Sequence, residues 1–231
     1  MGGLLAMTHH YERIILDVET QRDFFSPGGS LYNSTAAAAA KKIYSLFDWA
    51  KKEEIPVMST VLRVRHQDTS PLSPIPHCLD ETEGEQKLRR TILPSRINLG
   101  LLNTTDLPID IFSQYRQVIF EKRDTDIFAH ARAERLLTEM PITTFVIFGA
   151  GLANGICQAA IGLRTRGFGV IAADDAILSL DHPQAEMARM RMEAKGVVFA
   201  RSKDIIVPTP RRRHRLVPHR TTEPARKAHR R

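Results

Sequence analysis

Carboxylates, an ammonium group and a thiol each stand at the end of an apolar run in this sequence. Asp17 and Glu19 end the first run, Lys122 ends a later one, and Cys157 follows the glycine-rich stretch that begins near Gly151. A carboxylate can accept the proton of a thiol, and a nearby cation favours the thiolate that remains. These residue types together predict an activated nucleophile.

Short apolar runs alternate with segments of helical periodicity between residues 13 and 207. Strands are expected at 13–18, 56–60, 118–120, 145–148, 169–173 and either 197–200 or 205–207. Helices are expected at 36–50, 127–139, 155–166 and 183–195. Continuous apolar strands separated by helices predict an α/β fold, a three-layer αβα sandwich with a mostly parallel sheet of five or six strands. Ligands of such sheets bind at the carboxyl ends of the strands.

Residues 61–105 show little periodicity and contain four prolines. We expect a long excursion over the surface here, with one short strand near 91–93. Long loops of this kind are often functional, and this one could supply a subunit interface.

The positive charge is concentrated at the C-terminus. Residues 201–231 hold eleven Lys or Arg and two acidic residues, a net charge of +9. Subtracting these from the totals of 33 basic and 26 acidic residues leaves 22 and 24 in residues 1–200, a net charge of −2. We therefore expect a near-neutral domain at 11–207, a disordered N-terminus at 1–10 and a basic disordered tail at 208–231. Such a tail could contact nucleic acid or an acidic partner.

Several protein classes are excluded by what the sequence lacks. No apolar stretch approaches the roughly 20 residues of a membrane span, and the first residues lack the basic region of a secretory signal. We expect a cytoplasmic protein without membrane contact. Two cysteines are too few for a disulfide framework or a zinc finger.

Four stretches, taken in order, resemble the isochorismatase-like family of cysteine hydrolases, which includes nicotinamidases, N-carbamoylsarcosine amidases and ureidoacrylate amidases. They are Asp17-Val-Glu-Thr-Gln21-Arg-Asp23-Phe24 with Gly28-Gly29; Pro76-His77-Cys78 with Thr82-Glu-Gly84; Phe120-Glu-Lys122 with Asp126-Ile-Phe128; and Gly151-Leu-Ala-Asn-Gly-Ile-Cys157-Gln-Ala-Ala160. The resemblance extends from Arg13 to Ala200.

The resemblance implies hydrolysis of a small amide or carbamoyl substrate through a thioester. Cys157 would be the nucleophile, Lys122 would lower the pKa of its thiol, and an acidic residue would carry the proton. The amides of Ala153 and Cys157 would form the oxyanion hole, with a cis peptide between Leu152 and Ala153.

Two aromatic residues lie close to the predicted site in the sequence. We expect Phe24 and Phe128 to line the substrate pocket; the alternative is that they belong to the core, as aromatic residues near a sheet edge usually do. No cofactor is expected to be required. Relatives are often oligomers, so a homo-oligomer is expected.

Two residues compete for the role of the acid. Alignment on Gln21 and Asp23 places Glu19 at the family's catalytic Asp, whereas residue identity and strand position favour Asp17. Alternation along a strand would put both side chains on one face. We favour Asp17, because Glu19 would extend one methylene further into the site; if Glu19 is the acid, Asp17 would support it.

A divalent metal is a weaker expectation. Nicotinamidases carry an Asp-x-His pair near the second strand, and this sequence lacks it. His66, Asp68 and His77 could form a three-ligand site instead. The simpler interpretation is that these residues make loop hydrogen bonds.

Two other functions fit parts of the sequence. The glycines between Phe148 and Gly155, with Asp174 about 20 residues further on, imitate a dinucleotide-binding fingerprint. A catalytically degenerate family member could alternatively act as a binding scaffold that uses its basic tail.

Overall fold

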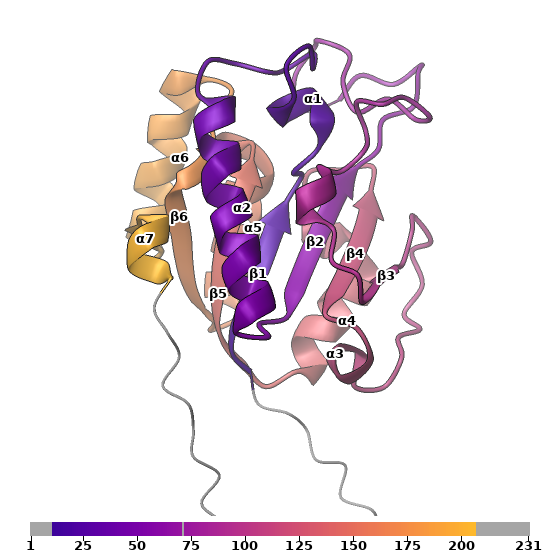
Figure 1. The fold of residues 1–231 in the computed structure, drawn as a ribbon, viewed down its shortest axis with the longest axis vertical. Coiled ribbons are helices and arrows are strands. Elements are labelled where there is room, and N and C mark those ends of the chain that lie inside the picture. Colours follow the sequence, from indigo (N-terminus) through magenta and orange to yellow (C-terminus); the bar gives the residue numbers. More distant parts are fainter. Residues whose placement is uncertain (1–10, 71, 207–231) are drawn as a thin grey trace, which may run out of the picture.

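The computed structural model describes residues 11–70 and 72–206, so the predictions for 1–10 and 208–231 lie outside the described residues. One sheet of seven strands, all paired in parallel, forms the middle layer, with strand order β3-β4-β2-β1-β5-β6-β7 (Figure 1). The strands are β1 (Tyr11–Val18), β2 (Val57–Leu62), β3 (Arg96–Asn98), β4 (Gln117–Lys122), β5 (Ile142–Ala150), β6 (Gly169–Leu178) and β7 (Val198–Ala200).

Helices cover both faces of the sheet. One face carries α1 (Arg22–Phe25), α2 (Ala36–Lys52) and α7 (Ser202–Ile205), and the other carries α3 (Ile111–Gln114), α4 (Ala131–Glu139), α5 (Cys157–Thr165) and α6 (His182–Ala194). Three short turns of helix, η1 (Arg89–Thr91), η2 (Ile127–Ala129) and η3 (Leu152–Ile156), complete the elements. The predicted three-layer αβα architecture is confirmed.

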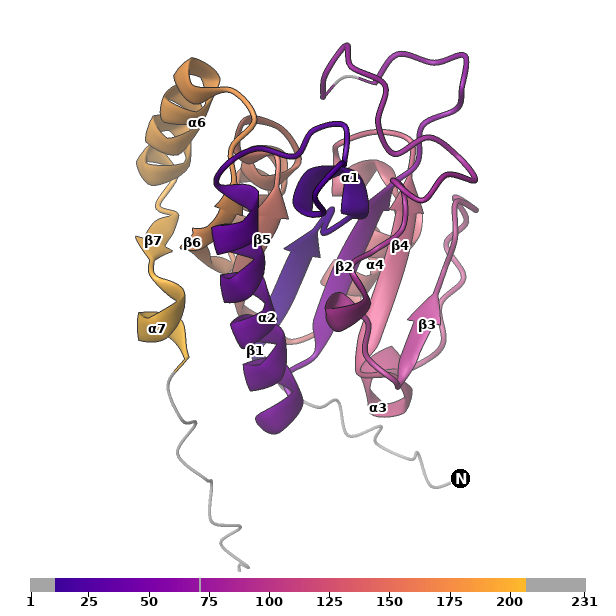
Figure 2. The same ribbon diagram turned by 45° about the horizontal axis from the view of Figure 1, so that its top comes forward.

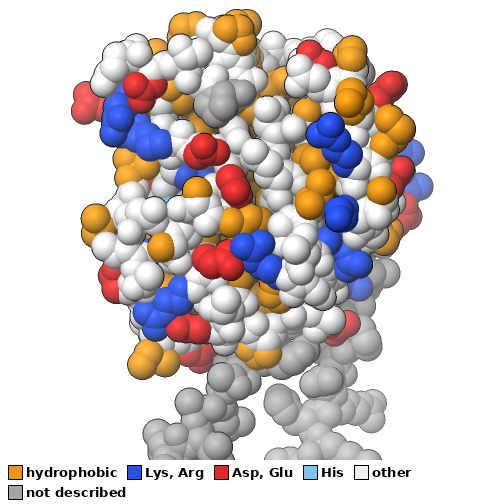
Figure 3. Space-filling view, turned by 180° about the vertical axis from the view of Figure 1, so that it is seen from behind, with side chains coloured by type: hydrophobic (Ala, Val, Ile, Leu, Met, Phe, Trp, Pro, Cys, Tyr) orange, Lys and Arg blue, Asp and Glu red, His pale blue; other side chains and the backbone are white. Residues whose placement is uncertain are grey.

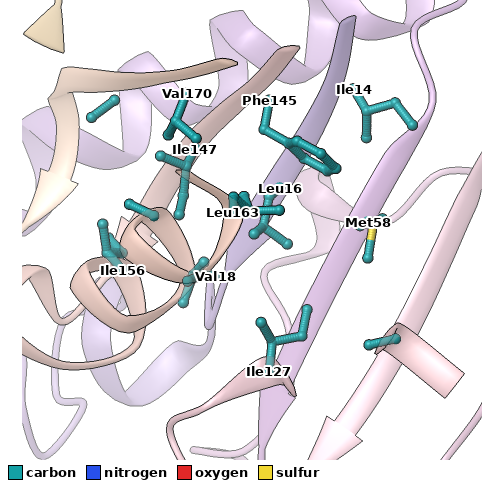
Figure 4. Packing of buried hydrophobic residues seen from close by; sticks show 14 of the residues in the cluster. Ile14, Leu16, Val18, Met58, Ile127, Phe145, Ile147, Ile156, Leu163 and Val170 are labelled. Atoms are coloured by element: carbon teal, nitrogen blue, oxygen red, sulfur yellow. The ribbon is translucent and has the colours of Figure 1, made fainter. Parts of the chain in front are cut away.

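Alternation along β1 divides the core between the two faces. Leu16 and Val18 point to the side of α5, where they pack near Leu163 (Figure 4), whereas Ile15 belongs to the cluster under α2. All of these side chains are buried. Burial on both faces explains why the central strands are continuous apolar runs rather than alternating ones.

Some sequence predictions differ from the structure. The sheet has seven strands rather than five or six, because Arg96–Asn98 adds an unpredicted strand to the edge of β4. Of the two alternatives for the last strand, 197–200 is confirmed, since Val198–Ala200 pairs with β6. The strand expected at 91–93 is absent from the described chain; the backbone turns there into η1, where Thr91 N bonds Leu88 O. Ile205 ends a short helix instead of forming a strand.

The predicted helices at 127–139 and 155–166 are each divided in two. The first is interrupted at His130, which has extended backbone angles between η2 and α4. The second begins with η3, a wider turn, before α5 starts at Cys157.

Gly149 allows β5 to pass close to the end of β1. Its φ is +131°, and a Cβ placed on it would lie 1.8 Å from Val18 O. The register between β5 and β6 also shifts between Ile147 and Gly149. Only a residue without a side chain fits this crossing.

Replacing Gly149 by alanine is expected to lower the free energy of unfolding by about 2–3 kcal/mol, since it combines a backbone clash with an unfavourable φ. Urea denaturation measures the change. Gly28→Ala is the control, because Gly28 has φ +87° but open space around it; it should cost only about 1 kcal/mol. Equal losses in the two variants would show that the close approach to Val18 has no energetic effect.

Charges of both signs are interspersed on the surface opposite the view of Figure 1 (Figure 3). No helix within the described residues is long and apolar enough to span a membrane.

Candidate active site

The carboxyl ends of the central parallel strands meet at one edge of the sheet and bring the predicted groups together. Glu19 follows the last residue of β1, Lys122 ends β4, and η3 with Cys157 follows β5. Because β1 lies between β2 and β5 in the sheet, residues distant in sequence share this edge (Figure 2).

Glu19 and Lys122 form a buried ion pair. Lys122 Nζ lies 2.5 Å from Glu19 Oε1 and also donates to the carbonyl oxygens of Asp124, at 2.8 Å, and Thr125, at 2.9 Å. The Glu19 side chain is fully buried and that of Lys122 is 4% exposed. All three ammonium protons therefore have acceptors, and the lysine is fixed in place.

The second oxygen of Glu19 is available for chemistry. Glu19 Oε2 is buried and has no hydrogen-bond partner among the residues that the structure describes. Gly155 borders the carboxylate, since a Cβ on Gly155 would lie 3.2 Å from Glu19 Oε1. A carboxylate held on one oxygen by a cation and free on the other can accept and return a proton.

Asp17 lies in a different network. Its Oδ2 accepts hydrogen bonds from Lys87 Nζ, at 2.6 Å, and from Ser59 Oγ, at 2.8 Å. Lys87 also donates to Thr20 Oγ1 at 2.8 Å. The sequence carried no signal for Lys87, which is a single lysine within the aperiodic segment.

The expectation that Asp17 and Glu19 share one face is therefore wrong. β1 ends at Val18, and Glu19 adopts a φ of +52°, which turns its side chain out of the strand alternation. The geometry favours Glu19, the alternative acid, as the partner of Lys122.

Gln21 and Asp23 hold the loop after β2 against α1. Gln21 Nε2 donates to the carbonyl oxygens of Leu62 and Glu85, both at 2.8 Å. Asp23 Oδ2 accepts from Cys78 N at 2.6 Å. Burial raises the pKa of the Cys78 thiol far above its ordinary value, and the neighbouring Glu19 carboxylate adds to this. Cys78 is therefore a structural residue rather than a nucleophile.

Cys157 begins α5, but its thiol points toward α6. Sγ donates to Ala188 O on α6 at 4.0 Å. Burial raises the pKa of this thiol, and Arg191 is the charge that opposes the shift. The expected lowering of the pKa by Lys122 is not present in this arrangement, because the thiol faces the other way.

The turn before Cys157 is irregular. Gly151 precedes it at φ +78°, and Asn154 has φ −118° and ψ −108°. No peptide bond of the described residues is cis, so the cis bond predicted between Leu152 and Ala153 is absent. The oxyanion-hole assignment of the Ala153 and Cys157 amides stays a prediction.

The raised pKa predicts slow alkylation of Cys157 in the resting protein. With iodoacetamide, the alkylation rate of Cys157 at about pH 7 should be well below that of an ordinary thiol, whose pKa is about 8.5. Above about pH 8.5 the rate of an ordinary thiol levels off, whereas that of Cys157 should continue to rise. Peptide mapping separates Cys157 from Cys78, and the urea-unfolded chain supplies the ordinary rate. Rapid modification at neutral pH in the folded protein would contradict the resting geometry.

The two predicted pocket phenylalanines make packing contacts. Phe24 is fully buried in the cluster under α2, with its ring 5.9 Å from that of His77. Phe128 packs against Gly162, and the Arg166 guanidinium lies 3.9 Å from the centre of its ring. Their role in a substrate pocket stays a prediction.

The three candidate metal ligands do not converge. His66 bonds Asp80 O at 3.0 Å, His77 bonds Ile75 O at 2.6 Å, and Asp68 pairs with Arg65 at 3.6 Å. Within the described part of the chain, no group of three His, Cys, Asp or Glu side chains could hold a metal ion. These residues do not fit a zinc site, and we derive no step through a metal.

Asp174 does not occupy the position expected of a ribose-binding acid. It lies within β6 rather than beyond a strand end, and it pairs with Arg189 on α6. The basic tail, on which the scaffold interpretation depends, lies outside the described residues.

A family model and the fold agree with each other. The isochorismatase domain model matches residues 106–204, and the described chain has the isochorismatase-like hydrolase fold. The predicted resemblance to this hydrolase family is confirmed. A search of the curated proteins gave no match.

Solved structures agree on the fold at low sequence identity. The nicotinamidase of Bacillus subtilis has 19% identity and a TM-score of 0.63, with 82% of this chain and 99% of that one covered. The pyrazinamidase of Pyrococcus horikoshii, solved in complex with zinc, has 20% identity and the same TM-score and coverage. An isochorismatase-like hydrolase from Alkaliphilus metalliredigens has 17% identity and a TM-score of 0.64, covering 84% of this chain and 97% of that one.

Proposed function

We propose that this protein hydrolyses the C–N bond of a small amide or carbamoyl compound, with Glu19, Lys122 and Cys157 as its catalytic residues. The observation that supports this most strongly is the buried Glu19–Lys122 pair at the strand edge, beside the turn that leads to Cys157. A buried carboxylate with one free oxygen is suited to proton transfer.

The reaction begins with the thiol of Cys157 turning from α6 toward Glu19. Glu19 Oε2 takes the thiol proton, and the thiolate adds to the substrate carbonyl. The tetrahedral intermediate then expels the amine, which receives the proton from Glu19, and a thioester remains on Cys157. Water, deprotonated by Glu19, attacks the thioester and releases the acid, and the thiol regains its proton.

Lys122 has two effects in this scheme. Its ammonium group holds Glu19 Oε1 by a hydrogen bond, so that Oε2 stays directed to the transferred proton, and its positive charge stabilises the thiolate once Cys157 approaches. Its two backbone acceptors, Asp124 O and Thr125 O, keep it at the strand end throughout. Because the pair is buried, these charge interactions are stronger than they would be in water.

A second candidate is thiol-independent hydrolysis, in which Glu19 alone transfers the proton to a substrate such as a vinyl ether. The orientation of the Cys157 thiol toward Ala188 favours this alternative. Cys157→Ser separates the two functions, because it abolishes the thioester route and spares the thiol-independent one.

The test is ammonia release from a panel of small amides that includes nicotinamide, pyrazinamide and N-carbamoyl amino acids. The amidase proposal predicts release with at least one compound and its loss in Cys157→Ser. Ammonia release that survives the substitution would contradict the thioester route. No hydrolysis with any compound of the panel would argue against the proposed substrate class.

A further inference from the structure

A cleft of about 510 Å³ opens on the β3 side of the sheet, and neither Glu19 nor Lys122 lines it. Glu121 lines it, and because neighbours on a strand point to opposite faces, Lys122 points away from it. α2 packs toward β6 and leaves this part of the sheet to one side (Figures 1 and 2). The walls are Val61, Arg63, Glu85, Gln86, Lys87, Arg89, Ile92, Arg96, Asn98, Ile119 and Glu121.

The two acids of the cleft are already paired. Arg63 lies 2.7 Å from Glu85 and 3.1 Å from Glu121, and it also contacts Asp80 at 3.2 Å. Asn98 donates a further hydrogen bond to Glu121 at 2.8 Å. Arg63 is therefore the shared cation of these three carboxylates. The lining as a whole holds four cations, Arg63, Lys87, Arg89 and Arg96, against two carboxylates, Glu85 and Glu121, so the cleft keeps a positive excess.

Arg89 and Arg96 carry the uncompensated charge. Both side chains belong to exposed residues, and neither forms an ion pair with any residue in the described ranges. The hydrogen bond from Arg96 to Leu93 O, at 3.1 Å, uses one donor of its guanidinium. Two guanidinium groups with free donors on one cleft are suited to phosphate, whose oxygens accept paired hydrogen bonds.

Lys87 adds a buried donor to the same cleft. The residue is 8% exposed, and its ammonium donates to Asp17 and Thr20. The third proton has no acceptor among the residues that the structure describes. A buried ammonium group with one donor left over is costly unless a further acceptor reaches it.

We propose that this cleft binds a small phosphate-bearing molecule, separately from the hydrolytic site. The phosphate would contact Arg89 and Arg96, with Lys87 as the buried donor. Ile92 and Ile119 supply an apolar wall for the organic part of the molecule. The cleft volume lies within the range of about 300–1,000 Å³ that is usual for small-molecule sites.

Calorimetric titration with phenyl phosphate at constant ionic strength tests the proposal, with phenol as the uncharged probe. We expect saturable binding of phenyl phosphate and none of phenol. Arg89→Ala and Arg96→Ala should each weaken binding by about tenfold, which is the effect of losing a charge-assisted contact. Arg201→Ala removes another exposed arginine, one that does not line the cleft, and should leave binding unchanged.

A substitution in the hydrolytic site separates this test of phosphate binding from the hydrolase proposal. Glu19→Gln should retain phenyl phosphate binding, since Glu19 does not line the cleft. No saturable binding, or binding that Arg89→Ala and Arg96→Ala leave unchanged, would overturn the inference. Loss of binding in Glu19→Gln would place the phosphate at the hydrolytic site instead, which also overturns it.

Discussion

Glu19→Gln is expected to lower kcat/KM for amide hydrolysis by about 10³-fold, the size of effect usual for loss of a general acid–base group. The amide is nearly the same size as the carboxylate but cannot take the thiol proton. Its oxygen can still accept from Lys122, which also keeps its bonds to Asp124 O and Thr125 O. The fold should therefore remain, and circular dichroism checks this alongside the kinetics.

Asp17→Asn is the matched control for Glu19→Gln. Asp17 is equally buried and is also paired with a lysine, but that lysine is Lys87. Both variants should lose stability, because each removes one charge from a buried ion pair, but the control should keep most of the activity. An active Glu19→Gln together with an inactive Asp17→Asn would reverse the assignment of the acid.

Lys87→Met is expected to destabilise the protein by about 3–5 kcal/mol, which is the usual cost of removing one partner from a buried ion pair. The substitution leaves the Asp17 carboxylate fully buried with Ser59 as its remaining side-chain donor. Ser59 itself accepts from Gln117, so the loss extends into a buried polar network. Urea denaturation at neutral pH measures the change in the free energy of unfolding.

The pair between Arg90 and Asp48 provides the comparison. Its side chains are 59% and 58% exposed, so Arg90→Ala should cost less than about 1 kcal/mol. The double variant Asp17→Asn/Lys87→Met removes both charges and should recover part of the stability lost in Lys87→Met. If Lys87→Met were as stable as Arg90→Ala, Asp17 could not be a buried carboxylate that depends on Lys87.

The fold could be predicted largely because the central strands are buried on both faces. Runs such as Phe145–Phe148 are apolar throughout, and helices with apolar faces separate them, so periodicity alone indicates a parallel sheet. The edge strand β3 escaped prediction, since Arg96–Asn98 is mostly exposed and polar and pairs only with β4. Periodicity likewise gives no sign of the break at His130.

The sequence predicts which residue types form the candidate site but not which of them contact one another. Glu19 and Lys122 are both candidates from the sequence, and alignment on Gln21 and Asp23 indicates Glu19 as the acid. Strand alternation wrongly predicts that Asp17 and Glu19 share one face, because it assumes that the strand continues through Glu19. Glu19 instead lies beyond the strand and has a positive φ. The direction of the Cys157 thiol depends on the turn at Leu152–Ile156, which no sequence pattern specifies.

Rapid-quench mass spectrometry of the protein mixed with its best amide substrate tests the central claim most directly. The account predicts a transient increase in mass equal to the acyl group, located on the peptide that contains Cys157 and absent in Cys157→Ser. Continued turnover in Cys157→Ser, with no acylated peptide in the wild type, would contradict a thioester mechanism at this site.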